Sequence, residues 1–200
     1  MTTSNQRTAD HAIDRQFLDR WSPRAFTDDT LPEATLLTFL EAARWAPSSY
    51  NSQPWRFVYA RRGTAHWSRF LGFLNDFNRG WAQHAAAIVI VLSKKTFVPP
   101  GAKDPVASPT HSFDSGAAWA QFGLQASLSG WKAHGLAGIE RERIRAELAI
   151  PDDYTIEAAL AIGRAGDPAQ LSEALRAREL PNGRLPLAAI SAEGAFAFSE

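Results

Sequence analysis

The sequence predicts an α+β fold in a single domain over residues 1–200. Three short runs rich in β-branched or aromatic residues, at 55–60, 87–93 and 155–163, are typical of strands. Amphipathic helical patterns lie between and around these runs, but helices and strands do not alternate in a regular βαβ rhythm. This mixture favours an α+β fold over a doubly wound parallel sheet. Residues 181–200 show no clear period and are predicted to be a C-terminal extension.

Two amphipathic helices are predicted before the first strand. Residues 11–20 carry apolar side chains at helical spacing, and residues 31–45 carry theirs on one stripe. Thr30 and Glu33 have the spacing of a capping box, in which each side chain bonds the backbone of the other, so the second helix is expected to begin there. Pro47 ends this helix, and a polar loop is expected after it.

Helices and a long loop are predicted between and after the strands. Residues 67–81 have one continuous helical pattern. Residues 94–111 contain four prolines and no period, and they form either a lid or binding loop or a mobile surface excursion. Residues 113–131 predict a helix with Ser112 as its N-cap. Its stripe of small residues packs either in the core or against a second subunit. Two further helices are predicted at residues 140–148 and from Asp167 and Pro168 onward.

Composition and charge exclude several classes of function. Hydrophobic residues make up 45% of the chain, which is enough to build a core. The formal net charge is zero and no long basic run occurs, so we expect no nucleic-acid partner. Without cysteine there is no thiolate nucleophile, and redox chemistry requires a cofactor. The longest apolar run, residues 85–92, is too short to span a bilayer, and no apolar signal core is present. We therefore predict a cytoplasmic protein with no membrane partner.

Common catalytic motifs are absent from the sequence. It has no glycine-rich phosphate loop, no GxSxG elbow and no HExxH pair, and its five histidines lack metal-ligand spacing. His111 and Asp114 are three residues apart and offer a base with its orienting acid, but N-capping by Ser112 is the simpler interpretation. We therefore name no catalytic side chain and no metal site.

Two stretches have patterns that suit ligand binding. In "RWSPR", Arg20, Ser22 and Arg24 alternate, so an extended backbone places them on one side. They form either an anion site or an exposed turn with two solvated arginines. In "APSSYNSQPW", residues 46–55, polar side chains lie between two prolines. They either bind a planar heterocycle or end the preceding helix.

Together the two stretches resemble the FMN-dependent nitroreductase family, whose N-terminal half runs R-x-S-x-R and then APSS-x-N-x-QPW. The resemblance extends over most of the chain. It includes "FNRGWAQHAAAIVIVLS", "HGLAGIERERIRAELAIPDDYTIEAALAIGRAGDP" and "LPNGRLP". It implies a central, mainly antiparallel β-sheet surrounded by helices, a bound FMN and a domain-sharing homodimer.

The resemblance also assigns residues to the cofactor. It places Arg20, Ser22 and Arg24 around the flavin phosphate and ribityl chain, and Arg184 closes the phosphate site. Guanidiniums suit this role because their forked donors match phosphate oxygens. Asn78 corresponds to the residue that bonds the flavin's pyrimidine edge. Residues that reach the flavin from the partner subunit are Pro47, Ser48, Ser49 and Asn51. Residues of a turn that lies against the flavin ring are Gly135, Leu136, Ala137 and Gly138.

The resemblance implies an oxidoreductase whose chemistry is carried by FMN. NADH or NADPH reduces the flavin, and the flavin then reduces a flat small-molecule acceptor, such as a nitroaromatic or quinone, in ping-pong order. The alternative is a flavin-binding or scaffold protein of the same fold without turnover. A third option is another flavin reaction, such as dehalogenation or heterocycle oxidation. The chain departs from some members at Trp81 and Asn182, where they carry lysine, so it offers less positive charge to a reduced flavin.

Overall fold

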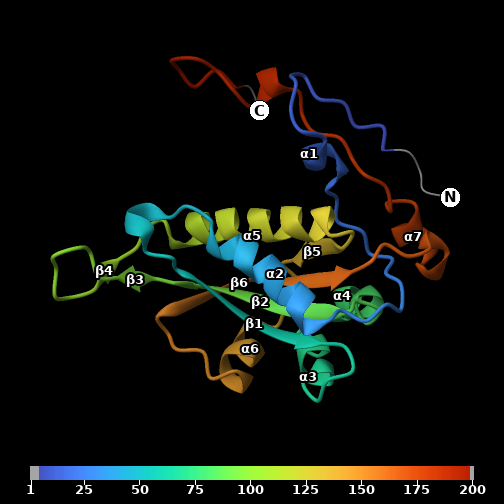
Figure 1. Cartoon of the computed structure of the whole chain (residues 1–200), viewed down its shortest axis with the longest axis horizontal. Coiled ribbons are helices and arrows are strands. Elements are labelled where there is room, and N and C mark those ends of the chain that lie inside the picture. Colours follow the sequence, from blue (N-terminus) through green and yellow to red (C-terminus); the bar gives the residue numbers. More distant parts are fainter. Residues whose placement is uncertain (1–4, 199–200) are drawn as a thin grey trace.

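The fold is centred on a four-stranded sheet in a computed structural model that describes residues 5–198. Every neighbouring pair of strands is antiparallel (Figure 1). The strand order is β1 (Trp55–Arg61), β2 (Ala87–Lys94), β6 (Tyr154–Gly163) and β5 (Lys132–Leu136). The predicted α+β class with a mainly antiparallel sheet is therefore confirmed. The three predicted runs form β1, β2 and β6.

Helices cover both faces of this sheet. They are α2 (Glu33–Arg44) and α5 (His111–Leu128) on one face, and α3 (Trp67–Leu71), α4 (Asp76–Ala82) and α6 (Arg141–Glu147) on the other (Figure 1). Phe39 of α2 and Phe122 of α5 meet edge to face beside Val89, with ring centroids 5.6 Å apart. Ile88 and Ile90 alternate with Val89 and point into the opposite layer. Because both faces are covered, β2 reads as one continuous apolar run.

Strand β5 was not predicted, and it corrects the turn expected at residues 135–138. Gly135 pairs with Leu160 and Leu136 pairs with Ala159, so both residues belong to the sheet. The segment contains a glycine and has little β-propensity, which is why its sequence does not indicate a strand. Its pairing with β6 decides its conformation.

The single helix predicted over residues 67–81 is two helices, α3 and α4. Between them Leu74 bridges to Ile139, and the Asn75 amide donates to the carbonyl of Gly138 over 3.1 Å. The Asn75 side chain then caps α4 by accepting from the amide of Asn78 over 3.0 Å. These tertiary hydrogen bonds interrupt the single helix that the continuous apolar pattern predicted.

The two helices before the first strand begin differently from the prediction. Helix α1 covers only Arg15–Asp19 and begins after Asp14, whose side chain accepts from the amide of Gln16. Pro32 occupies the N-cap of α2 without a side-chain bond, so the capping box is wrong. Glu33 instead accepts from the Tyr59 hydroxyl over 2.7 Å.

The predicted cap of the long helix is wrong as well. Helix α5 follows Thr110, and the Ser112 hydroxyl donates to Glu157 instead of capping the helix. Within the long loop before it, β3 (Thr96–Phe97) pairs with β4 (Val106–Ala107), so those four residues are not irregular. Phe97 of this hairpin stacks on Tyr50, with ring centroids 5.4 Å apart.

The two ends of the chain lie side by side and project from the helical layer (Figure 1). After β6 come η2 (Pro168–Gln170), α7 (Glu173–Arg176) and η3 (Leu187–Ala189). Asp167 caps η2 by accepting from the amide of Ala169 over 2.9 Å, in agreement with the predicted start there. We call residues 5–19 and 181–190 the terminal arms. The Leu187 amide joins them by donating to Asp10 over 2.8 Å.

The small residues of α5 divide between the core and the outside of the helix. Its buried residues are Asp114, Ser115, Ala118, Phe122, Gly123 and Ala126, whereas Gly116 and Ala120 are exposed. Phe113 is 81% exposed and Leu128 is 63% exposed, so an apolar strip runs along the outside of this helix.

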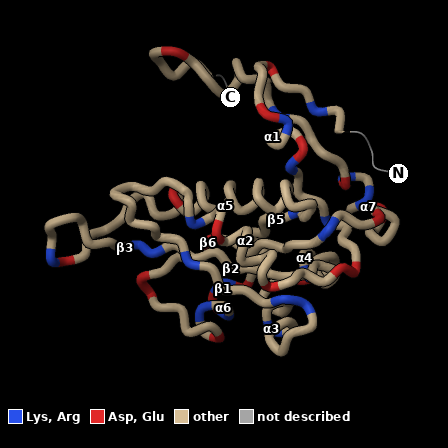
Figure 2. The backbone as a smooth tube through the Cα atoms, in the orientation of Figure 1, with Lys and Arg blue, Asp and Glu red and all other residues tan. Residues whose placement is uncertain are grey.

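Charged residues of both signs are interspersed along the molecule (Figure 2). Between residues 5 and 198, none of the helices has the length and apolar character that a bilayer span requires.

Candidate cofactor site

The segment from Arg20 to Phe26 leads from α1 to the end of β6, with a bend at Arg24. Phe26 bridges to Ala165, and the Thr27 amide donates to the carbonyl of Arg164 over 3.0 Å. Arg20 Nη1 donates to Ser22 Oγ over 3.2 Å, so these two side chains lie together as the alternation predicted.

A cavity of about 450 Å³ opens beside Arg20 and Ser22. Its wall is formed by Phe17, Arg20, Ser22, Trp119, Ala120, Gly123, Leu124 and Gly135. A Cβ atom on Gly135 would lie 3.5 Å from the Trp119 ring, and one on Gly123 would lie 3.7 Å from it. A methyl group at either position would make an ordinary van der Waals contact with the ring. The cavity therefore combines an apolar wall with a guanidinium and a hydroxyl.

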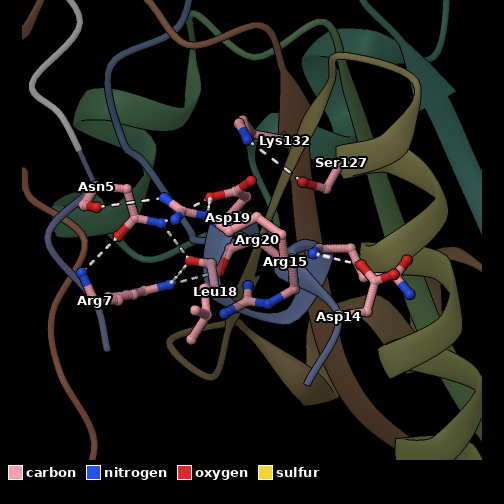
Figure 3. A network of polar contacts seen from close by, with 10 residues as sticks. Asn5, Arg7, Asp14, Arg15, Leu18, Asp19, Arg20, Ser127 and Lys132 are labelled. Carbon is pink, nitrogen blue, oxygen red and sulfur yellow. Dashed lines mark hydrogen bonds and ion pairs between the residues drawn. The ribbon is translucent and has the colours of Figure 1, made fainter. Parts of the chain in front are cut away.

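Positive charge gathers around Arg20 (Figure 3). Burial, followed by the charge of Arg184, lowers the pKa of Arg20. Burial also lowers the pKa of Lys132, and Arg20 and Arg7 lower it further against the opposing effect of Asp19. Lys132 Nζ has the Ser127 hydroxyl 3.5 Å away. We call Arg7, Arg20, Lys132 and Arg184 the cation cluster. An excess of positive charge at a half-buried position favours binding of an anion.

Arg7 supports this cluster by holding backbone carbonyls. Its Nη1 donates to the carbonyls of Leu18 over 3.0 Å and Arg20 over 2.8 Å, and its Nε donates to that of Asn182 over 2.7 Å. Asn182 Oδ1 also accepts from Arg184 over 3.3 Å. Asn182 therefore binds two arginines, Arg7 and Arg184.

A second cavity of about 600 Å³ lies between the terminal arms. Arg7 and Arg184 line it, and Phe17 belongs to the walls of both cavities. Arg184 itself is exposed and donates to its own loop at the Gly183 carbonyl over 2.9 Å. The structure thus brings Arg184 near Arg20 without placing it in the smaller cavity.

Arg24 is turned toward a buried carboxylate. Glu179 Oε1 accepts from the amides of Arg24 over 2.6 Å and Ala25 over 2.7 Å. Glu179 Oε2 lies 3.9 Å from Arg24 Nη1, and its side chain is 1% exposed. Glu179 therefore compensates part of the positive charge of Arg24. Glu179 was not identified from the sequence.

We expect Glu179→Leu to lower the free energy of unfolding by about 2–4 kcal/mol, because two buried amides lose their acceptor and Arg24 loses its carboxylate. Glu179→Gln keeps an acceptor oxygen and should cost less than half as much. Urea unfolding measures both, with Glu173→Leu on the exposed face of α7 as the matched control. Equal losses for Glu179→Leu and Glu173→Leu would contradict this role.

Trp81 and His134 form the wall behind this segment. Their ring centroids are 4.8 Å apart, and the Arg24 guanidinium lies 6.0 Å from the Trp81 ring centroid. His134 Nδ1 lies 2.9 Å from the carbonyl of Pro23, so this nitrogen carries the proton, because a carbonyl only accepts. Burial lowers the pKa of His134, and the charges of Arg24 and Arg20 lower it further. The imidazole is therefore neutral at pH 7.

This burial predicts a pH dependence of stability. Below the ordinary pKa of histidine, 6.5, the unfolded chain binds a proton that the folded His134 does not. The stabilisation is thus fully present above pH 6.5 and is lost as the pH falls toward the lowered folded pKa. His134→Gln keeps a donor for the Pro23 carbonyl. It should reduce the difference in the free energy of unfolding, measured with urea, between pH 5.5 and pH 8. The exposed His66→Gln control should leave that difference unchanged.

Asn78 at the start of α4 meets Gly138 after β5. Asn78 Nδ2 donates to the Gly138 carbonyl over 3.1 Å. A Cβ atom on Gly138 would lie 2.6 Å from Asn78 Nδ2, so this contact requires glycine. Ala137 and Gly138 follow β5 and form the part of the predicted turn that exists. The side chain of Leu136 is buried in the core.

The loop with Pro47, Ser48, Ser49 and Asn51 lies elsewhere in the same chain. The Ser49 amide donates to Asp114 Oδ2 over 3.2 Å, near the start of α5, whereas Gly123 of the cavity is nine residues further along. At 1.5 Å per residue the two points are about 13.5 Å apart. One chain therefore brings Arg20, Ser22 and Gly135 together but leaves this loop outside their cavity.

Sequence reasoning missed five residues of this region, namely Arg7, Trp119, Lys132, His134 and Glu179. The glycines opposite Trp119 and the lone lysine in an apolar stretch were weak signals for two of them. No cluster of three His, Asp or Glu side chains suited to a metal ion is found over residues 5–198.

Known proteins share this architecture. A model described as Nitroreductase family matches residues 18–85. A Streptomyces coelicolor protein named as an NADH dehydrogenase/NAD(P)H nitroreductase is 33% identical over 75 residues, which are 38% of this chain and 37% of that protein. The NADH dehydrogenase of Thermus thermophilus is 50% identical over 44 residues, 22% of each chain. The matches therefore span well under half of these curated relatives.

Solved structures extend the likeness to the whole chain. A crystal structure described as an oxidoreductase containing FMN has a TM-score of 0.94 and 44% sequence identity, and the match covers 100% of both chains. A nitroreductase in complex with FMN from Exiguobacterium sibiricum has a TM-score of 0.70 at 22% identity, over 92% of this chain and 99% of that one, which shows the shared fold. The architecture is thus that of the nitroreductase fold. The chain belongs to the nitroreductase family.

Proposed function

We propose that the protein is an FMN-dependent oxidoreductase. In this proposal NADH or NADPH reduces bound FMN, which then reduces a flat acceptor such as a nitroaromatic or a quinone in ping-pong order. The observation that carries the proposal is the cavity at Arg20, Ser22 and Gly135, where an apolar wall meets the cation cluster. The similarity to an FMN-containing oxidoreductase along the entire chain supports it.

The residues present fit an FMN molecule. Arg20, Ser22 and Arg184 would hold its phosphate and ribityl chain, with Arg24 beside them. The flavin ring would lie in the cavity that Trp119, Gly123 and Gly135 line. Asn78, with Ala137 and Gly138, would bond the pyrimidine edge, because an amide offers both a donor and an acceptor. When bound, FMN supplies the capacity to accept and donate a hydride.

The chain's own residues orient the cofactor and set its electrostatic surroundings. Arg7 fixes the backbone of Arg20, and Glu179 fixes that of Arg24. Trp81 and neutral His134 contribute no charge at the position where some nitroreductases carry lysine. A reduced, anionic flavin therefore gains less stabilisation here than beside a lysine.

We further propose that two chains build each site as a homodimer, with residues 1–200 acting as one domain that ends in the extension 181–200. The loop of Pro47, Ser48, Ser49 and Asn51 would reach the cavity of the partner subunit. The outward apolar strip of α5, marked by Phe113 and Leu128, supports this arrangement because a two-fold interface presents the same face from each chain.

The test is a reduction experiment without oxygen. Purified protein should carry a yellow flavin that bleaches when NADH or NADPH is added and regains its colour when a quinone follows. Initial rates should give parallel double-reciprocal lines. A yellow protein that does not bleach would instead support the alternative, a flavin-binding protein without turnover. A colourless protein that takes up no FMN would overturn both.

A further inference from the structure

A histidine, a carboxylate and two hydroxyls meet where β2, α5 and β6 come together. Ser93 Oγ lies 2.7 Å from His111 Nδ1 and donates its proton to Glu157 Oε1. The Ser112 hydroxyl donates to the same oxygen over 2.6 Å. Ser93 is fully buried, whereas His111 and Glu157 are partly exposed. This is a connected polar network outside the cofactor site, and the proposed function does not use it.

A β-bulge aims the carboxylate at the helix. Val91 pairs with Ala158 and Leu92 pairs with Ile156, so Glu157 is an extra residue without a partner on β2. Bulges re-aim side chains and are enriched next to active sites. Without this bulge, the regular alternation of side chains along β6 would turn the Glu157 carboxylate in another direction than toward Ser93.

The direction of the hydrogen bonds fixes the tautomer of His111. Both serine hydroxyls use their protons on Glu157, so the contact between Ser93 Oγ and His111 Nδ1 requires a proton on Nδ1. The other ring nitrogen is Nε2. It makes no hydrogen bond to any residue in the described range 5–198.

The network adjoins the loop that the proposed function sends to the partner's cavity. His111 is one turn before Asp114, which binds the Ser49 amide and the Thr110 hydroxyl. Tyr50, which follows Ser49 in this loop, is 69% exposed and stacks on Phe97. Tyr50 has φ 53°, a left-handed conformation that is costly for a bulky residue and is found more often at functional sites. Tyr50 exposes its ring beside the partly buried Phe97, and an aromatic surface of this kind suits a flat molecule.

We propose that His111 Nε2 is the proton donor to the acceptor, with Glu157 and Ser93 as positioning residues that hold its ring. The proposal rests on the proposed function. A quinone becomes a hydroquinone by gaining two electrons and two protons. The hydride from the reduced cofactor brings both electrons and one proton. The second proton comes from the imidazolium form of His111, in which both ring nitrogens carry a proton. The bond from Nε2 to hydrogen breaks as the quinone oxygen takes this proton, and the ring is left neutral with its proton on Nδ1. The neutral imidazole then regains a proton from solvent.

Several charged groups surround the network and enter its pH dependence. Glu157 on β6 faces the ring, with 3.7 Å between Oε1 and Nδ1, and Asp114 lies one turn along α5. Arg141 donates to the backbone carbonyl of Glu157 over 3.1 Å. Beyond Ser93, Lys94 lies 3.9 Å from Asp153.

The experiment compares two oxidants of the reduced holoenzyme by stopped flow. His111→Gln should slow reoxidation by a naphthoquinone about 100-fold at pH 7, the size of a lost general acid, and should remove one ionisation from its pH profile. Reoxidation by ferricyanide, which takes single electrons and no proton, should stay within twofold of the wild type. Reduction by NADH or NADPH should also be unchanged. His66→Gln, on the exposed surface near α3, is the matched control.

Two further measurements separate the possible outcomes. Imidazole ¹⁵N NMR should find His111 protonated on Nδ1 in wild-type protein at high pH, and Glu157→Gln should slow the quinone step less than His111→Gln. Equal slowing with both oxidants, an unchanged quinone rate or an Nε2-protonated tautomer would overturn the proposal. If wild-type protein is not reduced by NADH or NADPH, the proposed function fails and this inference fails with it. If wild-type protein turns over and His111→Gln matches it, only the inference fails.

Discussion

Arg20→Ala is expected to weaken FMN binding about 100-fold while riboflavin binding changes by less than about threefold. The guanidinium lies at the cavity with Ser22 and belongs to the cation cluster, so we expect it to bind the phosphate. A charge-assisted bond of this kind contributes about 1.5–3 kcal/mol, and 1.4 kcal/mol is tenfold in affinity. Riboflavin lacks the phosphate and therefore reports on the rest of the site.

Quenching of flavin fluorescence on titration with apoprotein measures both affinities. Arg69→Ala, which removes an exposed arginine of α3, is the matched control and should leave both unchanged. Raising the salt concentration should weaken FMN binding to wild-type protein more than binding to the Arg20 variant. Parallel losses for FMN and riboflavin would place Arg20 away from the phosphate.

Mixing two inactive variants is expected to restore half of the sites in each mixed dimer. Arg20→Glu damages the part of the site assigned to one chain, and Asn51→Arg damages the part assigned to its partner. In a heterodimer, one site carries both lesions and the other carries neither, because the two-fold axis exchanges the chains. FMN retention and reductase activity should therefore return together.

Subunit exchange must be shown independently, for example by native mass spectrometry of chains with different tags. Each variant alone, taken through the same exchange, is the control and should stay inactive. Confirmed heterodimers without FMN or activity would rule out a shared site. So would a monomer that keeps its flavin on dilution.

The elements that could be predicted from sequence are those whose local pattern agrees with their tertiary setting. Strand β2 is a continuous apolar run because helices cover both of its faces, and α2 has a clear stripe. Strand β5 could not be predicted because its pairing with β6 decides its conformation. The break between α3 and α4 depends on Leu74 and Asn75 meeting residues more than sixty positions later.

The candidate site divides in the same way. Arg20 and Ser22 are two residues apart, and their alternation in an extended segment is a local property that the sequence displays. Glu179 reaches the same segment from 155 positions away, and Lys132 joins the cation cluster only through folding. The surroundings of the small residues on α5 were also open, because a helical period shows which residues share a face but not what covers that face.

The bonds of Arg7 make cofactor retention depend on both ends of the chain. The Arg7 guanidinium donates to the carbonyls of Leu18, Arg20 and Asn182. These hydrogen bonds connect the two terminal arms. Cleavage of either arm by a protease would loosen the other and remove a support from Arg20, the arginine that we propose binds the phosphate. Limited proteolysis should accordingly be slower with FMN bound than without it. A covalent bridge between the arms would be a conservative way to engineer a protein that holds its cofactor longer.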